Sequence, residues 1–354
     1  MSAAEPVPFR LTSLAHGGGC GCKLSPAVLR ELLHGQFADS FPQLLVGNGK
    51  SDDAAVWQQE DGRCLVATTD FFMPIVDDPH HFGQIAATNA ISDIYAMGAK
   101  PLFALAILGI PLGKIDTDVV RDILAGGAAA CRAAGIPVAG GHSIDSAEPI
   151  YGLAVVGEAP AGQIRTNAGA LPGDVLILTK PIGVGLYSAM LKRGELGVDD
   201  YRTLVETTTL LNRIGMMFGT FDAVHALTDV TGFGLIGHGL EMARASGAQL
   251  LLDPASVPLL PRAAEWAQAG RATGASARNW AACEDGVALP DGFPQWQRDL
   301  LTDPQTSGGL LAAVAPEAAE DILALAHREG FAGARVVGRV QQGPAGVVIA
   351  PAAG

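Results

Sequence analysis

The chain has 354 residues, of which 49% are hydrophobic and 17% are charged. This length and balance predict a globular protein with more than one core and exclude a disordered polypeptide. The net charge of −13, from 36 acidic and 23 basic residues, argues against nucleic acid or an anionic membrane surface as the main partner.

The cysteines and the absence of long apolar runs indicate the compartment. No apolar run approaches the roughly 18 residues of a transmembrane helix, and the first residues lack the basic start and apolar core of a signal peptide. The five cysteines are odd in number and irregularly spaced, unlike a disulfide framework. We therefore expect a cytoplasmic protein with reduced thiols and no membrane partner.

The first part of the chain begins with a glycine-rich segment, residues 1–50, which we expect to be a flexible arm around one amphipathic piece at 27–34. Apolar residues then recur at helical spacing through 81–97, and 101–109 is continuously apolar, as in a strand buried on both faces. In chain order we expect a strand at 64–70, a helix at 81–97, strands at 101–109 and 136–139 flanking a helix at 116–134, a turn at 140–143 and a strand at 150–157.

A composition shift divides the chain. Residues 159–173 are rich in Gly, Pro and Ala, which predicts a linker and a domain boundary near residue 165. Beyond it we expect strands at 174–179, 249–252, 309–314 and 334–337, and helices at 184–192, 200–218, 235–246 and 316–328. The pattern therefore predicts two α/β halves.

The stretch from His16 to Lys23 carries two thiols in a glycine string. A mobile arm of this kind can close over a reaction and retreat. Three interpretations compete for Cys20 and Cys22: a metal pair, which lacks a second close pair elsewhere; a redox pair, which usually has a two-residue gap; and a nucleophile or chalcogen carrier activated by Lys23. The third fits the setting best. Cys64, Cys131 and Cys283 are expected to be buried hydrophobes.

Several carboxylates stand beside glycine turns or at strand ends. Asp52 and Asp53 follow a glycine turn, Asp70 ends an apolar strand, and Asp229 begins a turn that enters a helix. Asn89 and Asp93 are four residues apart and share a helix face. Oxygen ligands of this kind suit Mg²⁺ bound together with substrate phosphates. Taken singly, each acid also fits a turn cap, and the Asn89 face also fits a solvated helix surface.

Glycine turns offer a second signal. The segments 140–143 and 232–234 can expose backbone N–H groups to phosphate. Residues 47–51, Gly-Asn-Gly-Lys-Ser, have the composition of a Walker A loop without its spacing. Their alternative interpretation is a tight turn, so any ATP site here is of another type.

Ordered motifs identify a family. The chain resembles the selenophosphate synthetases, or selenide, water dikinases, over nearly its whole length. The motifs that carry the resemblance are HGGGCGCKLSP at 16–26, DDAAV at 52–56, TTDFFMPIV at 68–76, AATNAISD at 86–93, GGHSID at 140–145, TDVTGFG at 228–234 and DPQTSGG at 303–309.

The resemblance implies an α/β (α+β) fold of the aminoimidazole ribonucleotide synthetase type, in which the N-terminal domains of a homodimer form a shared β-barrel. It divides the chain into an arm at 1–50, an ATP- and metal-binding and dimerisation domain at 51–165, and a C-terminal α/β domain at 166–354. The implied reaction is ATP + selenide + water → selenophosphate + AMP + phosphate, with Mg²⁺ required and K⁺ activating. A selenium-delivery protein is a further candidate partner, and nucleic acid is not.

The resemblance also assigns residues. Cys20 aligns with the catalytic cysteine, a position that some relatives fill with selenocysteine, and Lys23 aligns with the essential lysine. Asp53, Asp93 and Asp229 align with metal ligands. Positions implied to contact ATP are Lys23, Lys50, Ser51, Asp52, Asp70, Asp93 and, reaching the partner subunit's nucleotide, Gly141, His142 and Ser143. Cys22 receives no chemical step.

Two alternatives remain at this point. One is another ATP-dependent enzyme of the same superfamily, such as aminoimidazole ribonucleotide synthetase or thiamine-phosphate kinase, which lack the thiol and lysine arm. The other is a non-catalytic thiol carrier of selenium or metal that binds nucleotide. The group of acids Asp53, Asp70, Asp93 and Asp229 argues against a carrier, because a carrier needs no phosphate and metal site.

Overall fold

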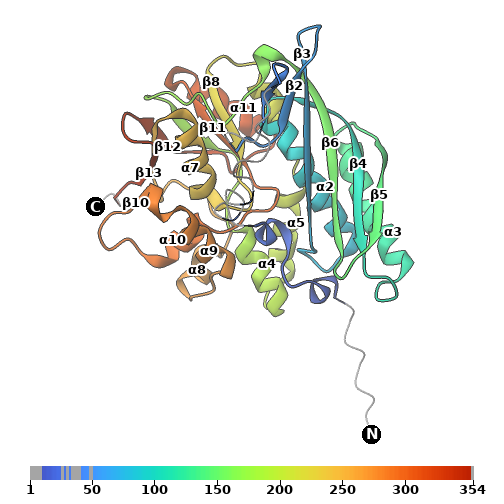
Figure 1. The fold of residues 1–354 in the computed structure, drawn as a ribbon. Helices are drawn as coiled ribbons and strands as arrows, with labels where there is room; N and C mark the ends of the chain where they lie inside the picture. The colour runs from blue at the N-terminus through green and yellow to red at the C-terminus, as the bar shows by residue number, and fades with distance from the viewer. Residues whose placement is uncertain (1–9, 25–27, 29–31, 33–40, 48–50, 352–354) are drawn as a thin grey trace.

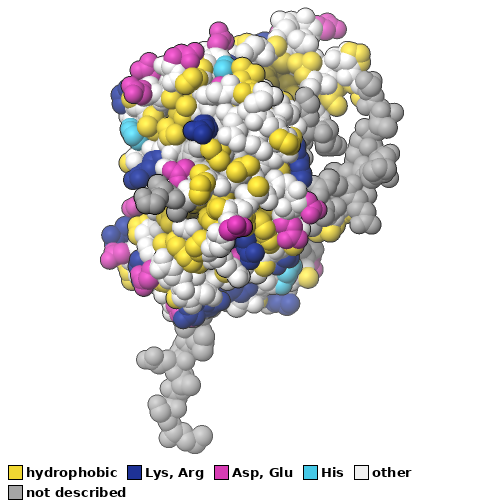
Figure 2. Space-filling view, turned by 90° about the vertical axis from the view of Figure 1, so that its left-hand side faces the viewer, with side chains coloured by type: hydrophobic (Ala, Val, Ile, Leu, Met, Phe, Trp, Pro, Cys, Tyr) yellow, Lys and Arg dark blue, Asp and Glu magenta, His cyan; other side chains and the backbone are white. Residues whose placement is uncertain are grey.

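The structure is a computed structural model that describes residues 10–24, 28, 32, 41–47 and 51–351. These residues form two mixed β-sheets with helices between and around them (Figure 1). Within the described part of the chain, no helix combines the length and the apolar character needed to cross a bilayer. On the face shown in Figure 2, acidic and basic side chains are interspersed rather than segregated.

The first sheet has the order β1-β2-β3-β6-β4-β5. Its neighbours are antiparallel except for β4 and β5, which run parallel and are connected through helix α3. This connection is a βαβ crossover, which parallel neighbours require. The elements are β1 (Leu44–Val46), β2 (Ala55–Gln58), β3 (Arg63–Phe72), α2 (Pro79–Ala96), β4 (Lys100–Ile110), α3 (Thr117–Ala133), β5 (Val138–Asp145) and β6 (Ile150–Pro160).

Helix α2 is the central element of the molecule. It packs against β3 and β6 of the first sheet and also contacts β8 and α5 of the second half. Fourteen of its eighteen residues are buried, as expected for a helix with neighbours on all sides. The Asp78 side chain caps its start by accepting a hydrogen bond from the His81 N–H at 2.8 Å, and Gly98, at φ +70°, follows its end.

The second sheet has the order β10-β13-β9-β12-β7-β11-β8. Strand β13 runs parallel to β9 and β10, and the other neighbours are antiparallel. Its strands are β7 (Val175–Leu178), β8 (Val224–Asp229), β9 (Gln249–Leu252), β10 (Val287–Ala288), β11 (Leu310–Val314), β12 (Arg335–Gln341) and β13 (Gly346–Ile349). The helices are α4 (Val184–Arg193), α5 (Val198–Thr209), α6 (Ile214–Phe218), α7 (Gly234–Ser246), α8 (Ala263–Gln268), α9 (Gly274–Cys283), α10 (Gln295–Leu301) and α11 (Ala319–Arg328).

Most predicted elements are confirmed within a few residues, including both long helices of the first half. Two predictions are wrong, and several elements, strand β8 among them, were not predicted. The expected turn at 140–143 is part of strand β5. The expected helix at 200–218 is two helices, because the chain leaves helical geometry after Thr209. Cys64, Cys131 and Cys283 are buried, as predicted.

The N-terminal segment approaches this framework through two short 3-10 helices, η1 (Leu11–Leu14) and η2 (Gly19–Cys22). Arg10 and Thr12 both bind the carboxylate of Asp77, just before α2. The described part of the segment therefore packs against the body of the protein, and the prediction of a mobile arm remains a prediction. The expected amphipathic piece at 27–34 falls largely outside the described residues.

Candidate active site

The turn η2 carries Cys20 into a narrow space between the two halves. The Cys20 backbone N–H donates to Thr306 Oγ1 at 2.9 Å, and the Gly19 N–H donates to the Met73 carbonyl at 3.0 Å. A Cβ at Gly18 would lie 2.6 Å from the carbonyl oxygen of Pro74, and one at Gly232 would lie 2.7 Å from that of Cys20. The close approach of this turn therefore requires glycine on both sides of the contact.

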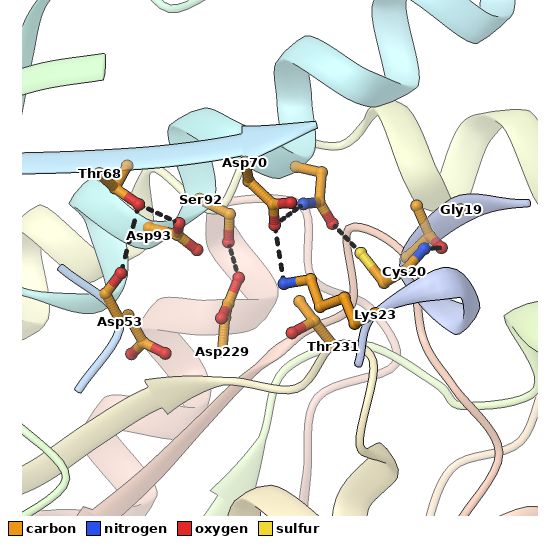
Figure 3. Close-up of polar contacts among 12 residues, drawn as sticks. Gly19, Cys20, Lys23, Asp53, Thr68, Asp70, Ser92, Asp93, Asp229 and Thr231 are labelled. Atoms are coloured by element: carbon orange, nitrogen blue, oxygen red, sulfur yellow. Dashed lines mark hydrogen bonds and ion pairs between the residues drawn. The ribbon is translucent and has the colours of Figure 1, made fainter. Parts of the chain in front are cut away.

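A chain of hydrogen bonds joins Cys20 to Lys23. The Cys20 thiol donates to Asn89 Oδ1 at 3.1 Å, and Asn89 Nδ2 donates to Asp70 Oδ2 at 2.8 Å. The same Asp70 oxygen accepts from Lys23 Nζ at 2.9 Å. Figure 3 shows Cys20 and Lys23 approaching from η2 while Asp70 projects from β3. The Lys23 ammonium is thus bound to Asp70 directly, and the Cys20 thiol is linked to Asp70 through Asn89. These side chains come from three segments of the chain, which are η2 with the residue after it, α2 and β3.

Burial and charge set the protonation of the thiol and the amine. Burial raises the pKa of Cys20 well above its usual value, and the negative charge of Asp70 adds to this while Lys23 opposes it. For Lys23, burial lowers the pKa, but Asp70, Cys20 and Asp93 together outweigh burial and the net shift is upward. The structure therefore favours a neutral thiol beside a charged ammonium.

The three predicted metal ligands lie next to this group (Figure 3). Asp93 on α2 accepts from Thr68 Oγ1 at 2.5 Å, and Asp229 at the end of β8 accepts from Ser92 Oγ at 2.5 Å. Asp53 precedes β2 and accepts from Thr228 Oγ1 at 3.1 Å. The acids and their hydroxyl partners therefore come from three parts of the fold. Thr68 lies on the first sheet, Ser92 and Asp93 lie on α2, and Thr228 and Asp229 lie on the second sheet.

The pKa of each of these three acids is raised. Burial raises the pKa of Asp53, Asp93 and Asp229, and the charge of Asp229 raises the pKa of the other two further. Their hydroxyl partners lower the pKa only in part. The charge of Lys23 lowers the pKa of Asp93 and Asp229 only in part. A group of carboxylates with so little compensating charge is electrostatically unfavourable, so the arrangement favours binding of further positive charge.

The residues fit a divalent cation that arrives with a nucleotide. Asp53 Oδ2 is buried and has no hydrogen-bond partner among the described residues. In the same part of the chain, no three His, Cys, Asp or Glu side chains form a group ready to hold a metal ion. Mg²⁺ usually binds one or two carboxylates together with substrate phosphates and water rather than a protein-only cage. The donor set therefore fits such an ion.

The neighbouring stretch at 50–52 is only partly described. Lys50 lies outside the described residues. Ser51, at φ +56°, and Asp52 are both tied to Asn167, whose backbone N–H donates to Asp52 Oδ1 and whose amide donates to the Ser51 carbonyl. This contact fixes the loop beside Asp53.

The segment at 141–143 does not meet the acids within one chain. Gly141, His142 and Ser143 lie on β5, an exposed edge strand that is separated from Asp70 on β3 by β6 and β4. Three strand spacings amount to roughly 14 Å. Their predicted role toward a partner subunit's nucleotide remains a prediction.

Sequence reasoning did not assign some residues that build the site. Asn89 was noticed only for its helical spacing from Asp93, and Thr68, Ser92 and Thr306 were not assigned. Thr68 and Ser92 immediately flank acids or lie in the same motifs, which is a signal that could have drawn attention to them. Thr306 lies in the motif at 303–309, but nothing in its spacing indicates contact with Cys20, 286 residues away.

Comparisons with known proteins agree on the family and the fold. A model of the AIR synthase related protein N-terminal domain matches residues 51–159, and a model of the corresponding C-terminal domain matches residues 172–351. A protein of Rhizobium meliloti (strain 1021), named selenide, water dikinase, is 58% identical and covers 96% of this chain and 98% of its own length. Proteins of the same name from Burkholderia orbicola and Dechloromonas aromatica are 54% and 53% identical, over 98% and 96% of this chain and 98% of each of their own lengths.

Solved structures share the fold at low identity. AaThiL complexed with AMPPCP and TMP has a TM-score of 0.66 at 19% identity, covering 92% of this chain and 93% of that protein. Thiamine-monophosphate kinase from Stenotrophomonas maltophilia K279a has a TM-score of 0.62 at 21% identity, covering 91% and 93%. Hydrogenase maturation protein HypE in complex with ATP has a TM-score of 0.60 at 20% identity, covering 88% and 87%. These likenesses establish the two-domain α/β architecture.

Proposed function

This chain belongs to the selenide, water dikinase family, and we propose that it converts ATP, selenide and water into selenophosphate, AMP and phosphate at the site described above. The observation that carries the proposal is the meeting of Cys20 and Lys23 with three buried acids and the half-buried Asp53 between the two halves of the molecule. A thiol and an ammonium thus lie beside a set of carboxylates suited to hold a metal-bound triphosphate.

Lys23 is proposed to bind and orient the transferring phosphate. Its ammonium stays charged because Asp70 raises its pKa, and it is one-third exposed and so within reach of a bound anion. Phosphoryl transfer is catalysed mainly by positioning and by charge stabilisation. A fixed cation beside the nucleotide would stabilise the charge that develops on the phosphoryl oxygens.

Cys20 is proposed to act on selenium. A buried thiol in a turn that lies against both halves can hold hydrogen selenide beside the phosphate, with no change of oxidation state, while bulk water is excluded. Asp53, Asp93 and Asp229 would hold Mg²⁺ with the nucleotide, and that ion would neutralise the triphosphate charge. The unpartnered Asp53 Oδ2 supports this assignment.

A homodimer is proposed from the outer face of the first sheet. Trp57, Phe71 and Leu105 are 42%, 46% and 39% exposed. Strand registers place all three on the face opposite to Asp70, where His142 of β5 also lies. An apolar face of this kind suits a second copy of the chain. Such pairing would bring 141–143 toward the partner's nucleotide and would form the shared barrel.

Activation by K⁺, a selenium-delivery partner and a cytoplasmic location remain further predictions.

Nucleotide products test the reaction. Purified protein is incubated anaerobically with ATP and Mg²⁺, with and without selenide, and the nucleotides are separated by chromatography. The proposal predicts selenide-dependent AMP. Formation of ADP as the final nucleotide would instead indicate an ordinary kinase of the superfamily.

A further inference from the structure

The amide of Asn89 has its orientation fixed from two sides. Its Nδ2 donates to Asp70 Oδ2 at 2.8 Å, and its Oδ1 accepts from the Ser307 backbone N–H at 2.7 Å. A backbone N–H can only donate, and a carboxylate paired with an ammonium accepts. Reversal of the amide would break both contacts, so the oxygen faces Cys20.

Ser307 is itself held firmly in place. It is fully buried, its φ is +49°, and its carbonyl accepts from Lys180 Nζ at 2.9 Å. The same loop holds Cys20, whose backbone N–H donates to Thr306 Oγ1. The second half of the molecule therefore fixes both the backbone of Cys20 and the amide that faces its sulfur.

The sulfur meets an acceptor in this arrangement. Cys20 Sγ lies 3.1 Å from Asn89 Oδ1, a carbonyl-type oxygen that carries no proton. A protonated thiol can donate a hydrogen bond to that oxygen. A thiolate has no proton to donate, so its sulfur and the Asn89 oxygen would be two acceptors that repel each other. The other groups that act on the sulfur are the cation Lys23, the acids Asp70 and Asp229, and the Cys22 thiol. Burial and the two acids favour the same neutral form.

We propose that Asn89 is a positioning residue that keeps Cys20 as a hydrogen-bonded, unreactive thiol while η2 is docked, so that Cys20 becomes a nucleophile only when the turn leaves this pocket. On undocking, the thiol loses the Asn89 acceptor and releases its proton to water. The inference rests on the proposed function in that Cys20 is the reactive thiol. It adds that the docked turn is a protected state of that thiol.

Vibrational spectroscopy of the S–H bond tests the contact directly, on the whole protein without substrates. The Cys20 S–H stretching band is isolated as the Raman difference between the wild type and Cys20→Ser at neutral pH. We expect a band shifted to lower frequency than that of a free thiol. For Asn89→Leu, the band is isolated as the Raman difference between Asn89→Leu and the double variant Asn89→Leu/Cys20→Ser. In that difference the Cys20 S–H band should lie at the frequency of a free thiol. Thr306→Val, which removes only the acceptor of the Cys20 backbone N–H, should keep the shifted band.

Reactivity provides a second measurement. With Cys22 replaced by serine, alkylation of Cys20 by iodoacetamide at neutral pH should be at least about tenfold faster in Asn89→Leu than with Asn89 present, since one pKa unit changes the thiolate fraction tenfold. Asn89→Ser serves if the leucine variant does not fold. Absence of a Cys20 S–H band in the wild type, or a band and an alkylation rate that Asn89 variants leave unchanged, would overturn the proposal. Neither measurement involves selenide or ATP, so failure of the proposed reaction would be seen separately, in the product assay.

Discussion

Nζ of Lys23 lies 2.9 Å from Oδ2 of Asp70, the same carboxylate oxygen that accepts a hydrogen bond from Asn89. Asp70 is 7% exposed, and a buried carboxylate needs a positive partner. The lysine of the N-terminal segment supplies that charge. Docking of the segment and completion of the site are therefore the same structural event.

Removal of the Lys23 charge is expected to impair catalysis. Lys23→Met should lower kcat by about 10²–10³-fold, the range found when one preorganised charge-stabilising donor is lost. Lys23→Arg keeps the charge and should retain part of the activity. Steady-state kinetics of both variants check this. Full activity in Lys23→Met would remove the lysine from the mechanism.

The two thiols of η2 should differ in importance. Cys20→Ser is expected to abolish selenophosphate formation while ATP binding, measured by calorimetry, persists. Cys22→Ser is the matched control and should have a milder effect, because the Cys22 thiol donates to the backbone carbonyl of Gly19 rather than to a side chain of the site. Equal loss of activity in both variants would indicate a dithiol mechanism instead.

Asp93→Asn is expected to weaken Mg²⁺-dependent ATP binding. The substitution removes one of the carboxylates proposed to hold the ion and retains the size of the side chain. Titration of nucleotide at limiting and at saturating Mg²⁺ checks this, and the largest loss of affinity should occur at limiting Mg²⁺. Unchanged affinity at limiting Mg²⁺ would exclude Asp93 from the metal site.

Although Asp93→Asn should weaken ATP binding, the same substitution should stabilise the folded protein when no metal is bound. Burial and Asp229 raise the pKa of Asp93 above its usual 3.8 in the folded protein, so the folded state binds the proton more tightly than the unfolded state. Stability is therefore lost as pH rises from about 4 through the raised folded pKa. Because asparagine does not ionise, Asp93→Asn removes this pH-dependent loss of stability. Thermal unfolding at pH 8 in chelator should give a Tm higher than wild type, and the difference should shrink at pH 4.

The outer face of the first sheet is expected to hold the proposed dimer together. Trp57→Glu places a charge on this apolar face and should convert the proposed dimer to a monomer in light scattering. Val198→Glu, at the exposed first residue of α5, is the control and should leave the oligomeric state unchanged. A Trp57→Glu protein that stays dimeric would refute this interface.

Local sequence patterns predicted many of the helices and strands but few of the hydrogen bonds within the site. Helix α2 could be predicted because its apolar spacing and its terminating Gly98 are local signals. Strand β5 was predicted only at its start, because Gly140 and Gly141 resemble a turn but adopt φ values of +154° and +156° within the strand, an extended geometry open chiefly to glycine.

The acids of the site were identified from their motifs, but the contacts of Asn89 were not. Asn89 reaches Cys20 across 69 residues and Ser307 across 218. Such contacts depend on how the two halves pack, and no periodicity in the sequence encodes them. For the same reason the protonation state favoured for Cys20 emerges only from the folded structure.

The most direct test of the central claim is phosphorus NMR of the reaction under anaerobic conditions with ATP, Mg²⁺ and selenide enriched in ⁷⁷Se. A phosphorus signal split by coupling to selenium, accompanied by one AMP and one phosphate for each selenophosphate, is the predicted result. A reaction that consumes ATP with ADP as its final nucleotide and no selenium-coupled phosphorus signal would contradict the account.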